Sequence, residues 1–143
     1  MYEKYTITGN EYDPLFIFAH GAGADSNSEF MKDMAARIAS EGICVIRFDF
    51  PYMIKRHEDG KRRPPDRAPK LIAAWQEVIN ELNRPCVLGG KSMGGRIASI
   101  VANDESSQNS HEIDVLIKGC ACLGYPFHPP GQPEKQRTSH LAE

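Results

Sequence analysis

One run of nine residues sets the architecture of this chain: Val87-Leu88-Gly89-Gly90-Lys91-Ser92-Met93-Gly94-Gly95. Its start, together with Cys86, is apolar and predicts a short buried strand over 86–88. The pattern Gly90-x-Ser92-x-Gly94 follows without a spacer, and a helix is predicted over 96–102. This order of strand, sharp turn and helix is typical of a nucleophile elbow, in which a serine hydroxyl projects from the apex of the turn.

The glycines around the serine have a steric explanation. At the apex of the turn we expect strained backbone angles for Ser92. We expect Gly90 and Gly94 to pass so close to the backbone of strand and helix that a Cβ atom would collide there. The helix begins beside Ser92, so its free N–H groups point at the hydroxyl. Ser92 is therefore the candidate nucleophile.

Two other interpretations of the same residues remain open. The first is a glycine-rich turn between strand and helix in which the serine has no chemical role. The second is a phosphate-binding loop of a nucleotide-binding protein, because Gly90-Lys91-Ser92 matches the end of the pattern G-x-x-x-x-G-K-S. That pattern requires a glycine where this chain has Pro85, and a flexible loop where a strand is predicted.

A second glycine-rich loop also follows a predicted strand directly. Residues 15–19 form a continuous apolar run, typical of a strand covered on both faces. The run ends in His20-Gly21-Ala22-Gly23-Ala24. In hydrolases with a nucleophile elbow, a loop in this place supplies one backbone N–H of the oxyanion hole, and small residues let it approach a substrate carbonyl. A plain strand-to-helix loop is the alternative.

The rest of the chain alternates between predicted strands and helices. Strands are expected within 2–8, at 43–50 and within 113–123, and helices at about 27–41 and 67–82. This order predicts an α/β fold with a mostly parallel sheet, right-handed crossovers and helices on both faces.

Helix ends and apolar faces are also predictable. We expect Asp25 or Ser26 to cap the helix 27–41, Gly42 to end it, and Asp66 to cap the helix 67–82. The expected apolar positions of the two helices are Phe30, Met31, Met34, Ala35 and Ile38 in the first, and Leu71, Ile72, Trp75, Val78, Ile79 and Leu82 in the second.

Composition narrows the functional classes. The 143 residues suffice for a single domain, 1–143, and the net charge of −2 disfavours a general nucleic-acid binder. No apolar run reaches membrane-spanning length, and the N-terminus begins no signal peptide. Four cysteines lie in predicted strands, which indicates buried, reduced thiols and a cytoplasmic protein: Cys44, Cys86, Cys120 and Cys122. We expect no metal site and no cofactor.

Residues 55–70 form a polar segment with seven Lys or Arg against three Asp or Glu. One interpretation is a solvated loop. The other is a loop on the substrate side of the sheet that attracts an anionic group, because loops that follow strands line the site in such folds.

Five stretches carry a family resemblance: 20–24, 47–53, 63–67, 89–95 and 123–130. With these motifs the chain resembles the α/β-hydrolase superfamily, and more closely the small bacterial predicted hydrolases of the KANL3/Tex30-like, dienelactone-hydrolase-like type. The resemblance implies Ser92 as nucleophile and an oxyanion hole from the backbone N–H groups of Met93 and Ala22. It implies esterase-like hydrolysis of a small acyl substrate through an acyl-enzyme.

The resemblance also implies an acid and a histidine on loops after two later strands. No Asp or His of the tail lies at a predicted strand end, and His128 and His140, the only histidines after the last predicted strand, do not match the position of the base. We expect the acid and the base of the triad to be absent from this chain. We therefore expect the N-terminal part of an α/β-hydrolase fold that lacks its last strands, truncated at its C-terminal end. The segment 113–123 would then be an exposed sheet edge that favours self-association. The alternative function is an inactive hydrolase fragment that binds or associates.

Overall fold

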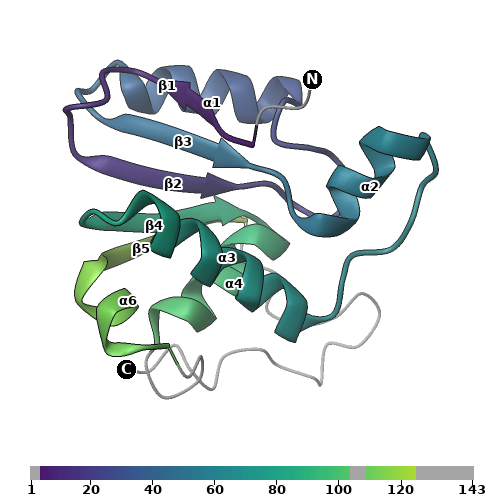
Figure 1. Cartoon of the computed structure of the whole chain (residues 1–143). Helices are drawn as coiled ribbons and strands as arrows, with labels where there is room; N and C mark the ends of the chain where they lie inside the picture. Colours follow the sequence, from purple (N-terminus) through teal and green to yellow (C-terminus); the bar gives the residue numbers. More distant parts are fainter. Residues whose placement is uncertain (1–3, 104–108, 125–143) are drawn as a thin grey trace.

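The computed structural model describes residues 4–103 and 109–124 (Figure 1). The described strands are β1 (Thr6–Thr8), β2 (Leu15–Ala19), β3 (Cys44–Phe48), β4 (Cys86–Lys91) and β5 (Ile117–Leu123). They form one sheet in the order β1-β3-β2-β4-β5. β1 runs antiparallel to β3, and the other neighbours are parallel. The mostly parallel sheet that the alternation predicts is confirmed.

The described helices are α1 (Glu29–Ala39), α2 (Pro51–Asp59), α3 (Ala68–Leu82), α4 (Met93–Ala102) and α6 (His111–Leu116). Successive side chains of β2 point to opposite faces of the sheet. Phe16 and Phe18 pack in a cluster with residues of α1, whereas Ile17 packs in a cluster with residues of α3 and α4, among them Trp75. Helices therefore cover both faces of the sheet, as predicted.

Helix α1 begins later than predicted, and its buried face centres on Met31 and Ala35 rather than on Phe30. Ser28 is the N-cap, and its side chain accepts a hydrogen bond from the Met31 N–H. Met31 is fully buried in the cluster that Phe16 and Phe18 form, whereas Phe30 is 38% exposed. The expected caps Asp25 and Ser26 are wrong, because residues 25–28 form a turn, in which the Ser28 N–H donates to the Asp25 carbonyl at 3.2 Å, and the helix begins only after it. Gly42 has the expected positive φ of 82° but lies after the helix end.

The first part of the basic segment 55–70 is helical rather than a loop. Pro51 occupies the first turn of α2, where its missing N–H costs nothing, and Gly60 ends the helix with φ 70°. Asp66 does not cap α3, whose N-cap is Arg67. The Asp66 carboxylate instead accepts a hydrogen bond from the Tyr52 N–H at 2.9 Å. Asp66 therefore caps the first turn of α2, although it lies after that helix in the sequence.

The strand predicted within 113–123 begins at Ile117, after the short helix α6. Cys44 and Cys86 are buried as predicted, but Cys120 is exposed and Cys122 half-buried, since β5 is an edge strand of the described sheet. In residues 4–103 and 109–124, no helix combines the length and apolarity that crossing a bilayer requires.

Candidate active site

Strand β4 leads directly into a sharp turn at Ser92. This residue has φ 52° and ψ −116°, angles that a non-glycine residue rarely adopts, and α4 begins at the next residue. The Ser92 N–H donates to the Leu123 carbonyl of β5 at 2.7 Å, and the Ser92 carbonyl accepts from the Arg96 N–H at 2.9 Å. The predicted backbone strain at Ser92 is confirmed. Gly90 and Lys91 lie within β4, so the flexible loop of a phosphate-binding pattern is not present there.

The predicted close approach of the elbow glycines is confirmed as well. A Cβ on Gly90 would lie 2.6 Å from the Gly94 carbonyl carbon and 2.8 Å from the Ala19 carbonyl oxygen. A Cβ on Gly94 would lie 2.8 Å from the same Ala19 oxygen and closer still to the His20 oxygen. All of these are backbone atoms, so no side-chain rearrangement could make room. The two glycines thus let α4 pack directly against the ends of β2 and β4.

The loop 20–24 and Ser92 meet at the carboxyl edge of the sheet. β2 and β4 are neighbours, with Ala19 opposite Gly90. The helix that follows β2 covers one face of the sheet, and the helix that follows β4 covers the other. The two loops therefore diverge and leave a crevice, the usual ligand-binding place of open α/β sheets. A cavity of about 300 Å³ lies there, lined by Gly21, Ala22, Gly23, Ala24, Ser28, Met31, Lys91 and Ser92.

This cavity, called the serine cavity below, brings together most of the predicted site residues. Gly21 fits closely, because a Cβ there would lie 3.3 Å from the Lys91 carbonyl oxygen, whereas a Cβ on Gly23 would meet no atom within 4 Å. Met93 is the first residue of α4, where a helix N–H has no acceptor within the helix. The Lys91 ammonium lies 4.7 Å from the centre of the Phe30 ring.

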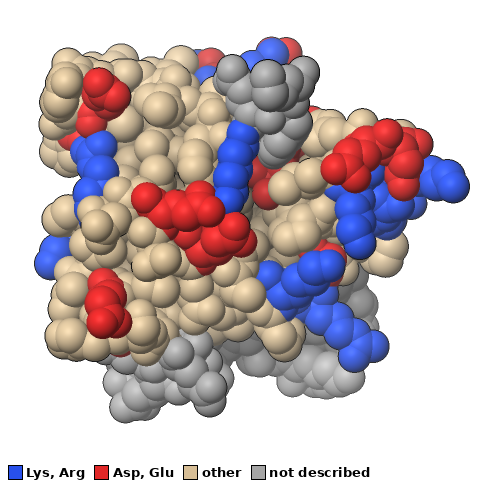
Figure 2. All heavy atoms as spheres, viewed as in Figure 1, with Lys and Arg blue, Asp and Glu red and all other residues tan. Residues whose placement is uncertain are grey.

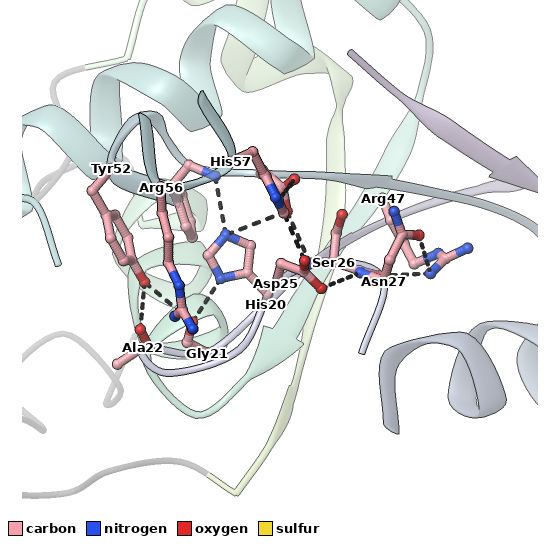
Figure 3. Close-up of polar contacts among 12 residues, drawn as sticks. His20, Gly21, Ala22, Asp25, Ser26, Asn27, Arg47, Tyr52, Arg56 and His57 are labelled. Atoms are coloured by element: carbon pink, nitrogen blue, oxygen red, sulfur yellow. Dashed lines mark hydrogen bonds and ion pairs between the residues drawn. The ribbon is translucent and has the colours of Figure 1, made fainter. Parts of the chain in front are cut away.

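Helix α2 holds the loop 20–24 in place (Figure 3). The Tyr52 hydroxyl lies 2.9 Å from the Ala22 carbonyl and 3.2 Å from the Gly21 carbonyl, and donates to them. The Arg56 guanidinium donates to the Gly23 carbonyl at 3.2 Å. Burial raises the pKa of Tyr52 above its usual value, so the hydroxyl remains a donor at neutral pH. Three successive carbonyls of the loop are thus fixed from one side.

His20 is a structural residue in this arrangement. Its side chain is fully buried. Its Nε2 accepts a hydrogen bond from the Phe50 N–H at 3.0 Å, so Nδ1 carries the proton and donates to the Gly21 carbonyl at 2.6 Å. Burial lowers the pKa of His20 below its usual value, which keeps the ring neutral. The imidazole therefore ties the loop to the residue that precedes α2.

His57 lies on α2 and not on the loop that the sequence indicates. Its Nε2 is 3.2 Å from a carboxylate oxygen of Asp49 and 3.3 Å from one of Asp25 (Figure 3). Of the residues that the structure describes, no histidine lines the serine cavity. His128 and His140 lie outside the described residues.

Several residues that support the site escape prediction. The Asp49 carboxylate accepts from the Ser26 N–H at 2.8 Å, and the Arg47 guanidinium donates to the Ser26 carbonyl at 2.6 Å. Both charged side chains are about 5% exposed. Charged residues inside or directly after a buried strand are the signal that could have identified them, because buried charges require partners. Tyr52 has no comparable signal. The described part of the chain holds no group of three metal-ligating side chains.

Comparison with known proteins agrees with this arrangement. The model of a family described as an alpha/beta hydrolase domain matches residues 12–143. A dienelactone hydrolase from Anabaena variabilis is similar in structure, with a TM-score of 0.64 and 16% identity over 84% of this chain and 55% of that one. The thioesterase domain from the curacin biosynthetic pathway has a TM-score of 0.61 and 20% identity over 96% of this chain and 47% of that one.

A lipase from Bacillus licheniformis is also similar, with a TM-score of 0.60 and 18% identity over 87% of this chain and 47% of that chain. At these identities the likeness concerns the fold. The chain spans about half the length of the solved structures that it matches.

Proposed function

This chain belongs to the alpha/beta hydrolase domain family, and we propose that it is a serine hydrolase that cleaves acyl esters with Ser92 as nucleophile. The observation that carries the proposal is the strained Ser92, held at the apex between β4 and α4 and exposed to the serine cavity. A strained residue that the surrounding backbone holds rigidly is a frequent sign of a catalytic position.

The proposed chemistry proceeds in two steps. The Ser92 Oγ attacks the carbonyl carbon of the ester, its proton passes to a base, and the alcohol leaves with a proton. Water then attacks the acyl-enzyme, releases the acid and restores the serine hydroxyl. The N–H groups of Met93 and Ala22 would donate to the oxyanion in both steps. Each such donor typically stabilises the transition state by about 3 kcal/mol.

None of the described residues is placed to act as the base that takes the proton from Ser92. The described histidines are tied to other partners or lie away from the serine cavity, so we place the base outside the described residues. The same observation favours a second candidate, an inactive hydrolase domain that binds a ligand without hydrolysing it. We also keep the KANL3/Tex30-like subtype, a cytoplasmic location and self-association through β5 as proposals, the last because β5 is an edge of the described sheet.

Hydrolysis of p-nitrophenyl esters by the full chain tests the proposal. We expect release of p-nitrophenol, with an acyl adduct visible by intact mass, and loss of both in Ser92→Ala. Ser40→Ala is the matched control, because Ser40 is exposed at the C-terminal end of α1 and does not line the serine cavity. Folded protein that neither hydrolyses the esters nor forms an adduct would favour the inactive candidate.

A further inference from the structure

A second cavity, of about 370 Å³, opens beside the serine cavity. It is lined by Ala22, Gly23, Arg56, Arg62, Arg63 and Pro64, and is called the arginine cavity below. Three arginines thus line one hollow, and no Asp or Glu is among its described lining residues. Figure 2 shows several Lys and Arg side chains, with Asp and Glu side chains beside them, on the side of the molecule formed by α2 and the segment that follows it.

Nearby acids neutralise these charges only in part. Arg63 Nη2 pairs with the Asp59 carboxylate at 2.6 Å. Its other terminal nitrogen, Nη1, is buried and has no hydrogen-bond partner among the residues described. Arg56 donates to the neutral Gly23 carbonyl. Like charges that line one cavity repel one another, and a buried donor without a partner costs free energy. An anion bound beside these arginines would lower both costs.

The two cavities share the same piece of backbone. Ala22 and Gly23 line both of them, and Ala22 is also the proposed oxyanion donor. A ligand with its carbonyl at Ser92 could therefore extend past Ala22 and reach the arginines. Tyr52 and Arg56 of α2 already hold the backbone of Ala22 and Gly23, which separates the two cavities. A ligand that occupies both cavities therefore needs no movement of α2.

We propose that the arginine cavity binds an anionic group, a carboxylate or a phosphate, that is carried by the acyl substrate. This inference rests on the proposed function. Guanidinium groups form paired, charge-assisted hydrogen bonds with both kinds of oxyanion. The preferred substrate is therefore an ester with a second, negatively charged end, and Arg62 and Arg63 determine this specificity.

Three p-nitrophenyl esters that differ only at the far end of the acyl chain test the proposal: valerate, hemiglutarate and 4-phosphonobutyrate, which end in a methyl, a carboxylate and a phosphonate. We expect kcat/KM for at least one charged ester to exceed that for valerate by about tenfold or more, the effect of one charge-assisted hydrogen bond. The faster of the two charged esters identifies the anionic group. Equal rates for all three esters would overturn the proposal.

The variants assign the preference to particular residues. Arg62→Ala with Arg63→Ala should abolish the preference for the charged ester. Lys55→Ala with Lys61→Ala is the matched control, because it removes the same charge from exposed positions of the same segment that do not line the cavity, and should retain the preference. A preference that both double variants lose would indicate general charge attraction and contradict the proposal.

Binding to Ser92→Ala separates a failure of this inference from a failure of the proposed function. Calorimetric titration with glutarate and with inorganic phosphate should show saturable binding of one of them, lost after the two arginine substitutions. If no ester is hydrolysed but this binding occurs, the proposed function fails and the anion site stands. If esters are hydrolysed but neither anion binds, the anion site fails alone. If an anion binds but the charged esters are hydrolysed no faster than valerate, the cavity binds an anion that is not part of the substrate, and the proposal is contradicted.

Discussion

Replacing Ser92 by glycine should make the protein more stable while it removes the proposed nucleophile. Ser92 has φ 52° and ψ −116°, and only glycine adopts such angles without steric cost. Strain of this kind costs about 1–3 kcal/mol at a non-glycine residue. Glycine also increases the entropy of the unfolded chain, which offsets about 0.4–1 kcal/mol of that gain. The expected net stabilisation is about 1.3 kcal/mol at the middle of these two ranges.

Ser92→Ala is the control that isolates the backbone contribution. Alanine removes the same hydroxyl but keeps the Cβ atom, so the strain remains. Urea unfolding of the two variants, with equal m-values, gives the difference in the free energy of unfolding. We expect Ser92→Gly to unfold at higher urea than Ser92→Ala. If the two variants unfold at the same urea concentration, or alanine is the more stable, the turn is not strained and the argument for a rigidly held serine fails.

Three further predictions concern the packing around the site. Gly94→Ala should destabilise the protein by about 1–3 kcal/mol in urea unfolding, since the new Cβ would meet backbone oxygens. Gly23→Ala is the control and should change stability little, since a Cβ there would meet no atom within 4 Å. Equal stabilities of the two variants would contradict the packing at the elbow. Asp66→Ala should cost about 1 kcal/mol through the lost cap of α2, and an unchanged free energy of unfolding would refute that role. Stability should fall below pH 6.5, because the lowered pKa of His20 means that the unfolded chain binds the proton first; a pH slope of equal size in His20→Gln would refute this assignment.

The elbow is the part of the structure that sequence predicts best. Gly90, Ser92 and Gly94 are close in the chain, so their spacing is enough to predict the turn, the strain at Ser92 and the approach of Gly90 to Gly94. The approach of both glycines to the end of β2 depends in addition on where the sheet places that strand. That β2 and β4 are neighbours then follows, because they must lie side by side for the loop 20–24 to reach Ser92. The central sheet and the serine cavity were predictable for this reason.

The supports of the site were not predictable, because their partners are distant in sequence. Asp66 lies just before α3 and is a residue type common at N-caps, yet it caps α2 instead. Ser26 is likewise held by Asp49 rather than capping α1. Cys120 is exposed because β5 is an edge of the described sheet, as expected for 113–123, although its apolar neighbours in the sequence indicate burial. Local patterns thus predict elements, whereas caps and burial at edges depend on tertiary contacts.

Labelling of the full chain with a fluorophosphonate, followed by intact mass, tests the central claim most directly. The reagent phosphonylates a serine only when its hydroxyl is activated, and it requires no knowledge of the natural substrate. We expect a single rapid addition to the native chain, no addition to Ser92→Ala, and unchanged addition to Ser40→Ala. Folded protein that remains unlabelled, or that is labelled equally in Ser92→Ala, would contradict Ser92 as the nucleophile.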